Sequence, residues 1–224
     1  MHFEKSSLQF LKELKKNNTR EWFADHKPTF KEAQDNAKAL YAAIQANLNK
    51  HDEIDKFKLF RIYRDVRFSK DKTPYQPHFA GSFSRQGKHL RGGYYLRIRP
   101  GESFLAGGFW EPNKEDLFRI RKEFELDDTE IRKILKEKSY VKYFGGQFEG
   151  EELKTAPKGF DKEHPAIDLI RKKGFIAVRK FSDKEVLATN FLKEVDDTYK
   201  ALRPFFDYMS EVLTTDLNGV SLID

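Results

Sequence analysis

The spacing of the apolar residues changes near residue 57, and this change constrains the fold more than any other feature of the chain. From Pro28 onward, apolar side chains recur at the 3.6-residue period of a helix. From Phe57 they alternate with polar ones, at the period of two that is typical of a strand. Beyond residue 110 the spacing is again mainly helical. Helices followed by strands and then by helices indicate an α+β fold rather than a doubly wound parallel sheet.

The expected elements follow from these periods and from the turn residues between them. A long helix is predicted from Pro28 to Leu48, and a final long helix over 191–213, bent near Pro204. Strands are expected at 57–68, 80–85, 94–99, 103–110 and 175–181. We therefore expect a single domain over residues 1–224, with a mostly antiparallel sheet packed by N-terminal and C-terminal helices.

The composition excludes several classes of protein. The chain has no cysteine, which rules out disulfides, iron–sulfur clusters, thiolate zinc sites and cysteine nucleophiles. It has no metal-ligand motif, P-loop, nucleophile elbow or dinucleotide-binding glycine spacing, so we predict no metal and no cofactor. Aromatic residues make up 14% of the chain, which excludes disorder as its overall state. The absence of a leader-like start and of a long apolar run predicts a cytoplasmic protein that does not associate with membranes.

The positive charge of the chain is concentrated in one segment. The whole sequence has a net charge of +6. Residues 57–100 contain 11 Lys and Arg against only Asp65 and Asp71, a net charge of +9, whereas the rest of the chain is slightly acidic. Such a concentration creates a local positive potential and indicates an anion-binding site. A solvated face with internal ion pairs is the alternative.

The densest group of candidate binding residues lies in this basic segment. Alternation along a strand would place four side chains on one face: Arg61, Tyr63, Asp65 and Arg67. The same alternation places Tyr95, Arg97 and Arg99 together on a later strand. If the two faces coincide, the arginines form a cradle for a carboxylate or phosphate, because a guanidinium suits both. The alternative is a solvent-exposed face with weak cross-strand pairs.

Further candidates lie beside this strand. Arg64 falls among the apolar positions, so we expect it to point inward, either in a structural salt bridge with an acid from a helix or toward a ligand. The loop over 69–79 is stiffened by two prolines and adds further candidate ligand-binding residues: Lys70, Lys72 and Tyr75. Asp65 and His78 are the candidates for proton transfer.

A long motif within this segment carries a resemblance to a known family. Residues 61–75 read Arg-x-x-Arg-Asp-x-Arg-Phe-Ser-x-Asp-Lys-x-Pro-Tyr, and an Asn-Thr-Arg-Glu-Trp-Phe segment occupies residues 18–23. Gly-Gly-x-Tyr and Gly-Gly-x-Trp segments follow at 92–95 and 107–110. On these residues the chain resembles a family of uncharacterised conserved bacterial and fungal proteins, classed as a domain of unknown function. The resemblance runs essentially end to end and implies one domain, but no particular reaction.

Three functions fit these observations. The first is binding of a phosphate- or carboxylate-bearing small molecule on the arginine-rich face, with or without catalysis. The second is a nucleic-acid-binding module, in which Tyr63 and Tyr95 stack on bases and the basic residues contact phosphates. The third is a structural or interaction domain, in which the motif is an internal salt-bridge network. The sequence decides neither between enzyme and binding protein nor between oligomeric states.

Overall fold

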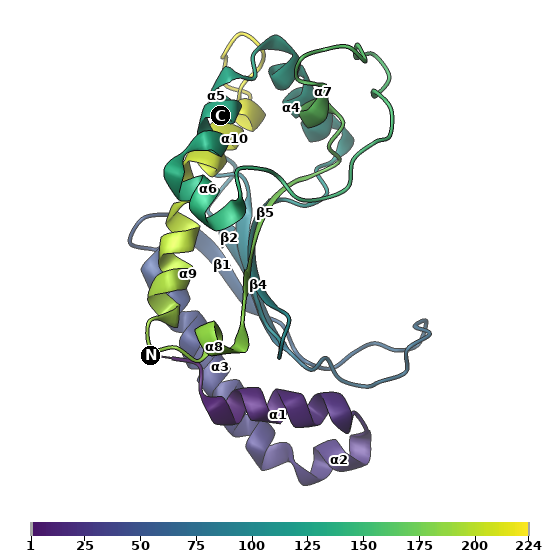
Figure 1. Ribbon diagram of the computed structural model, residues 1–224, viewed down its shortest axis with the longest axis vertical. Helices are drawn as coiled ribbons and strands as arrows, with labels where there is room; N and C mark the ends of the chain where they lie inside the picture. Colours follow the sequence, from purple (N-terminus) through teal and green to yellow (C-terminus); the bar gives the residue numbers. More distant parts are fainter. Residues whose placement is uncertain (1, 224) are drawn as a thin grey trace. The chain divides into compact units, whose positions relative to one another are not determined.

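The α+β class is confirmed by a computed structural model that describes residues 2–223 (Figure 1). The helices are α1 (Lys5–Lys16), α2 (Arg20–Asp25), α3 (Lys27–Leu48), α4 (Lys114–Leu126), α5 (Thr129–Lys136), α6 (Lys138–Phe144), α7 (Ile167–Ile170), α8 (Asp183–Val186), α9 (Phe191–Lys200) and α10 (Arg203–Thr214). The strands are β1 (Ile54–Leu59), β2 (Phe79–Arg85), β3 (Gly93–Ile98), β4 (Ser103–Phe109) and β5 (Phe175–Phe181). They form an antiparallel sheet in the order β1-β2-β3-β4-β5.

Contacts between residues divide the chain into two compact units. The first unit contains residues up to 83 together with 95–105 and 180–197, and the second contains 84–94, 106–179 and the residues from 198 onward. Strands β2 to β5 contribute residues to both units. A single domain over the whole chain stays a prediction.

The core of the first unit forms around α3, whose helical period the sequence predicts. The Thr19 hydroxyl caps α2 by accepting a hydrogen bond from the Trp22 N–H, and Pro28 occupies the first turn of α3. The apolar stripe of α3 is buried: Phe30, Ala33, Ala37, Leu40, Tyr41, Ile44 and Leu48. The Tyr41 hydroxyl lies 2.9 Å from the Leu96 carbonyl oxygen and 3.2 Å from that of Phe79. This buried hydroxyl therefore joins α3 to both β2 and β3.

The core of the second unit is rich in phenylalanine. The rings of Phe205 and Phe206 on α10 pack against Phe109 on β4, and the Phe205 ring also contacts that of Phe148. The Phe206 ring packs edge-on against Tyr94 of β3. The predicted final helix is two helices, α9 and α10, and Pro204 lies at the start of the second, where its missing N–H costs least.

The predicted strand over 57–68 is wrong beyond its first part. Strand β1 ends at Leu59, and residues 60–78 form an irregular segment, called the arm here, that extends to the right in Figure 1. A single bridge between Tyr63 and Tyr75 pairs the two sides of the arm. The return side contains Pro74 and Pro77, which lack the N–H that a strand ladder requires. The arm therefore cannot continue the sheet, although its residues alternate.

None of the helices within residues 2–223 combines the length and the apolar character needed to cross a bilayer.

Candidate functional site

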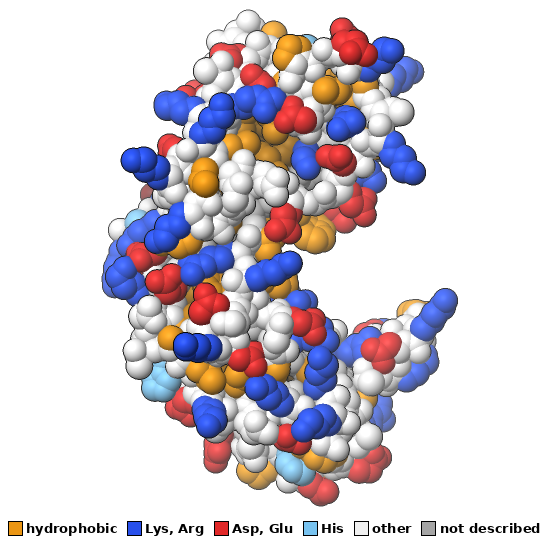
Figure 2. Space-filling model, in the orientation of Figure 1, with side chains coloured by type: hydrophobic (Ala, Val, Ile, Leu, Met, Phe, Trp, Pro, Cys, Tyr) orange, Lys and Arg blue, Asp and Glu red, His pale blue; other side chains and the backbone are white. Residues whose placement is uncertain are grey.

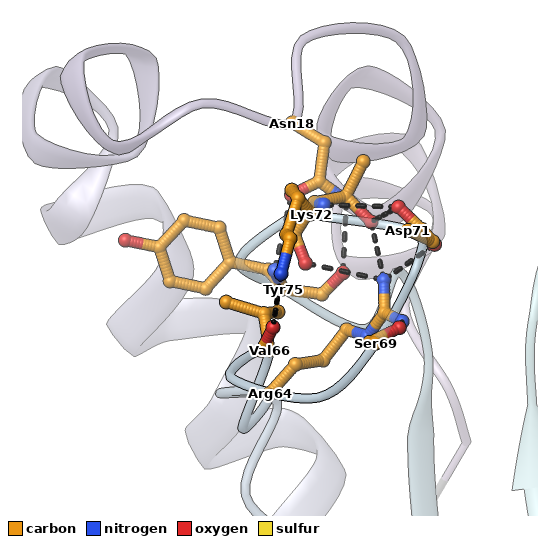
Figure 3. A network of polar contacts seen from close by, with 8 residues as sticks. Asn18, Arg64, Val66, Ser69, Asp71, Lys72 and Tyr75 are labelled. Atoms are coloured by element: carbon orange, nitrogen blue, oxygen red, sulfur yellow. Dashed lines mark hydrogen bonds and ion pairs between the residues drawn. The ribbon is translucent and has the colours of Figure 1, made fainter.

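The arm is held together by a polar network centred on Arg64 (Figure 3). Its Nη1 lies 2.5 Å from Asp71 Oδ2 and donates to the Thr73 carbonyl oxygen at 3.1 Å, while its Nη2 lies 3.4 Å from Ser69 Oγ. Hydrogen bonds from Thr73 and then from Arg64 lower the pKa of Asp71 to about 2. The predicted structural salt bridge of Arg64 is therefore present, but its acid lies in the arm and not on a helix.

The tip of the arm is a tight turn over 66–69. The Ser69 N–H donates to the Val66 carbonyl oxygen at 3.3 Å, so Arg67 and Phe68 lie at the two central positions of this turn. Lys72 Nζ donates to the carbonyl oxygens of Val66 at 3.0 Å and of Arg67 at 3.3 Å. The lysine thus fastens the return side of the arm to the turn, as Figure 3 shows for Val66.

The base of the arm is attached to the N-terminal helices through Tyr75. The side chain of Asn18 accepts from the Tyr75 N–H at 3.1 Å and donates to its carbonyl oxygen at 2.8 Å. The Tyr75 ring is buried and stacks on Phe23 of α2 at a centroid distance of 4.1 Å. Since Asn18 and Phe23 flank the Thr19 cap, the segment 18–23 holds the arm in place.

A pocket of about 530 Å³ lies where the arm leaves the sheet, within the size range of small-molecule sites. It is lined by Phe60, Arg61, Tyr63, Arg64, Asp65, Ser69, Gln76, His78, Ala80 and Tyr95. These residues come from the arm, from β2 and from the exposed face of β3. Among residues 2–223, no group of three His, Asp or Glu side chains is placed to hold a metal ion.

Most arginines near the pocket are already paired with acids. Arg67 forms a two-pronged ion pair with Asp65, with Nε–Oδ1 and Nη2–Oδ2 distances of 2.9 and 2.6 Å. The hydrogen bonds from Arg67 are the main reason that the pKa of Asp65 is lowered. On the sheet, Arg97 and Arg99 lie 4.0 and 3.5 Å from the carboxylate of Glu102.

Arg61 differs from these arginines. It is exposed and lines the pocket, and it has no hydrogen bond or ion pair with any residue that the structure describes. Its charge acts only at a distance, as a minor contribution to the lowered pKa of Asp65. The pocket therefore contains an uncompensated guanidinium.

His78 is the histidine of the pocket, and its environment keeps it neutral. Its Nδ1 is buried and has no hydrogen-bond partner among the described residues. Burial, followed by the positive charges of Arg97 and Arg99, lowers the pKa of His78 to about 4. At neutral pH the imidazole therefore carries no charge and resists protonation, but it can still share a hydrogen bond.

This lowered pKa predicts a dependence of stability on pH. Between pH 6.5 and 4 the unfolded chain binds a proton at this histidine and the folded chain does not, so stability is complete above pH 6.5 and falls as the pH approaches 4. We expect a loss of about 1 to 2 kcal/mol in the free energy of unfolding, after allowance for solvent screening. Urea titrations of the wild type and of His78→Gln test this. The variant cannot protonate, so an identical pH dependence in both proteins would contradict it.

The structure brings together only part of the residues that the sequence selects. Arg61, Tyr63, Arg64, Asp65, His78 and Tyr95 line the pocket. The side chains of Arg67, Lys70, Lys72, Tyr75, Arg97 and Arg99 do not, so the predicted cradle of four converging arginines does not form. The predicted separation of the two faces of β3 is confirmed, because Tyr94, Leu96 and Ile98 are buried and their neighbours are half-exposed.

Several residues that form the pocket or hold the arm are not predicted from the sequence. Phe60, Ser69, Gln76 and Ala80 also line the pocket, and Asn18 holds the base of the arm. The family motif contains Ser69, and the segment 18–23 contains Asn18, but nothing in the sequence indicates that the two stretches lie side by side.

The arm and the segment that holds it both lie within a region that matches a known family. No curated protein matches the chain. A family model described as "conserved hypothetical protein (DUF2461)" matches residues 6–208, which include the pocket and the arm. The chain therefore belongs to this family, a domain of unknown function.

Proposed function

We propose that the pocket of the first unit binds a small molecule carrying a phosphate or a carboxylate. The observation that carries this proposal is Arg61, which lines the pocket without a hydrogen-bonded or ion-paired partner among the described residues. An unpaired guanidinium beside an open cavity offers two parallel N–H donors to an anion.

The rest of the pocket suits the non-ionic part of such a ligand. The Phe60 and Tyr95 rings lie 6.4 Å apart, and both line the cavity together with Tyr63. Aromatic rings can pack against a sugar or a planar ring, while Gln76 and neutral His78 offer uncharged hydrogen bonds.

If the bound molecule reacts, His78 is the uncharged group placed to share a hydrogen bond with it, although its lowered pKa makes it a weak base. It is neutral at neutral pH, whereas Asp65 is ionised and engaged by Arg67. Arg64 also lines the pocket, but its guanidinium is hydrogen-bonded to other residues of the arm, so we assign it a positioning role.

The proposal predicts stabilisation by an anion and its loss in Arg61→Ala. A thermal-shift screen with inorganic phosphate, pyrophosphate, citrate, sugar phosphates and nucleoside monophosphates should raise the Tm of the wild type by about 5 to 10 °C for a ligand at a hundredfold excess over its Kd. Removing the guanidinium should weaken binding of that ligand by about 10- to 100-fold, as measured by calorimetry.

Arg20→Ala is the matched control, because Arg20 is an exposed arginine of α2 that lies outside the pocket. It should bind the ligand as the wild type does. The proposal fails if no anion stabilises the protein, or if both substitutions weaken binding equally.

A further inference from the structure

The tip of the arm presents an aromatic ring to solvent. The Phe68 residue is 96% exposed, more than any other large hydrophobic residue in the described part of the chain. Scattered exposed apolar residues are ordinary on protein surfaces. Phe68 differs because it sits at a central position of the turn over 66–69, at the end of a projecting segment.

The backbone that carries this ring is held by hydrogen bonds within the arm, and the Arg67 guanidinium lies over the ring itself. The Ser69–Val66 hydrogen bond closes the turn, Lys72 binds two of its carbonyl oxygens, and Arg64 ties Ser69 to Asp71. A flexible loop would lose conformational entropy on capturing a partner, and this cross-linked turn has already lost most of it. The arm therefore holds Phe68 ready for binding.

The surroundings of Phe68 are positively charged. Residues 61–72 contain five basic and two acidic side chains, a net charge of +3. Arg64 and Arg67 are neutralised by Asp71 and Asp65, so the excess lies on Arg61, Lys70 and Lys72. Lys70 is exposed beside the turn and has no hydrogen-bonded or ion-paired partner among residues 2–223. Figure 2 shows basic side chains gathered on the arm.

Exposed aromatic rings continue from the tip toward the sheet, and cations lie near the rings of Phe60 and Phe68. Tyr63 and Phe60 are 49% and 38% exposed. Lys58 Nζ lies 5.2 Å from the centre of the Phe60 ring, and the Arg67 guanidinium lies 5.9 Å from that of Phe68. Rings interleaved with cations are the surface that single-stranded nucleic acids require, because every base has a face to stack and every nucleotide a phosphate.

We propose that the arm binds single-stranded nucleic acid, with Phe68 stacking on a base and Lys70 contacting a phosphate. A duplex fits less well, because its base faces are covered by their neighbours in the stack. An anionic membrane also fits less well, because the turn offers one apolar side chain to the bilayer, and stable attachment requires more apolar area. The two residues to which this inference assigns contacts, Phe68 and Lys70, lie outside the small-ligand pocket, although Phe60 and Tyr63 line it.

The test is fluorescence polarisation with a labelled oligothymidylate of about 12 nucleotides, at low salt and over a salt series. The wild type should bind, and its affinity should fall as salt rises. Phe68→Ala should weaken binding about tenfold, and Phe68→Trp should retain it, because both rings stack. Lys70→Ala should weaken binding modestly and reduce the salt dependence by about one phosphate contact.

Two controls separate the tip from general surface effects. Phe118 is an exposed phenylalanine on α4, and Lys158 is an exposed lysine without a partner among the described residues, so Phe118→Ala and Lys158→Ala should bind as the wild type does. The inference is overturned if the oligonucleotide does not bind at low salt, or if Phe68→Ala binds unchanged. Sedimentation with phosphatidylserine vesicles that depends on Phe68, without oligonucleotide binding, would instead assign the tip to membranes. Because Phe68→Ala leaves Arg61 in place, small anions should still stabilise that variant, whether or not the oligonucleotide binds.

Discussion

Gly108→Ala should strongly destabilise the protein, although it adds only one methyl group. A Cβ at this position would lie 2.1 Å from the Phe175 carbonyl oxygen and 2.9 Å from the Ile176 Cα, in the adjacent strand β5. The φ of Gly108 is +141°, a value that residues with a Cβ rarely adopt. Because both clashing atoms belong to backbone, no side-chain rotation relieves them, and the β4–β5 pairing must open.

We expect a loss of at least about 3 kcal/mol in the free energy of unfolding. For a chain of this size, that corresponds to a Tm lower by about 10 °C, measured by circular dichroism.

Gly87→Ala is the matched control for this substitution. Gly87 also has a positive φ, +70°, but an added methyl group there would meet no atom within 4 Å. It should cost only the left-handed backbone strain, about 1 kcal/mol. If the two variants melt at the same temperature, the close approach of β4 to β5 at Gly108 is not what makes glycine necessary there.

Arg64→Ala should loosen the arm while leaving the rest of the protein folded. The Arg64 side chain is only 17% exposed and binds Asp71, Thr73 and Ser69, so its removal cancels several charge-assisted hydrogen bonds at once. We expect the free energy for local opening of the arm to fall by about 2 kcal/mol. Cleavage within residues 60–78 by thermolysin should then be about 30-fold faster, in the regime where cleavage follows the population of the open form.

Arg67→Ala gives the comparison for this second prediction. Arg67 also pairs with an acid of the arm, but its side chain is 76% exposed, and ion pairs in water contribute little. Its cleavage rate should remain close to that of the wild type. Equal acceleration in the two variants would show that the arm is not organised around Arg64.

The periodicity of the apolar residues predicts those helices and strands whose formation depends only on local spacing. The stripe of α3 from Phe30 to Leu48 and the alternation of β3 are both confirmed, because each depends only on which residues face a core. The strand predicted to reach Phe68 is wrong for a different reason. Alternation describes an extended chain, but a strand also needs a neighbour with free N–H groups, and the return side of the arm has prolines instead.

In the candidate site, too, the sequence predicts local features but not the contacts between segments. The sequence correctly indicates where the basic residues are concentrated, and it includes Arg61 and His78 among the candidates that line the pocket. It does not indicate which charges remain free. Asp65 binds Arg67 two residues away, and the β3–β4 turn brings Glu102 to Arg97 and Arg99.

By itself, then, the sequence determined the α+β class, the buried faces of the helices and strands, and the concentration of charge in residues 57–100. Only the tertiary structure decided that Arg61 is left unpaired in a pocket and that Phe68 is held out in solvent. The physical reason is that composition sets the number of charges and rings, whereas pairing and exposure depend on distances between segments far apart in the chain. Here those distances are set by the hydrogen bonds of Arg64, Lys72 and Asn18, which shape the arm.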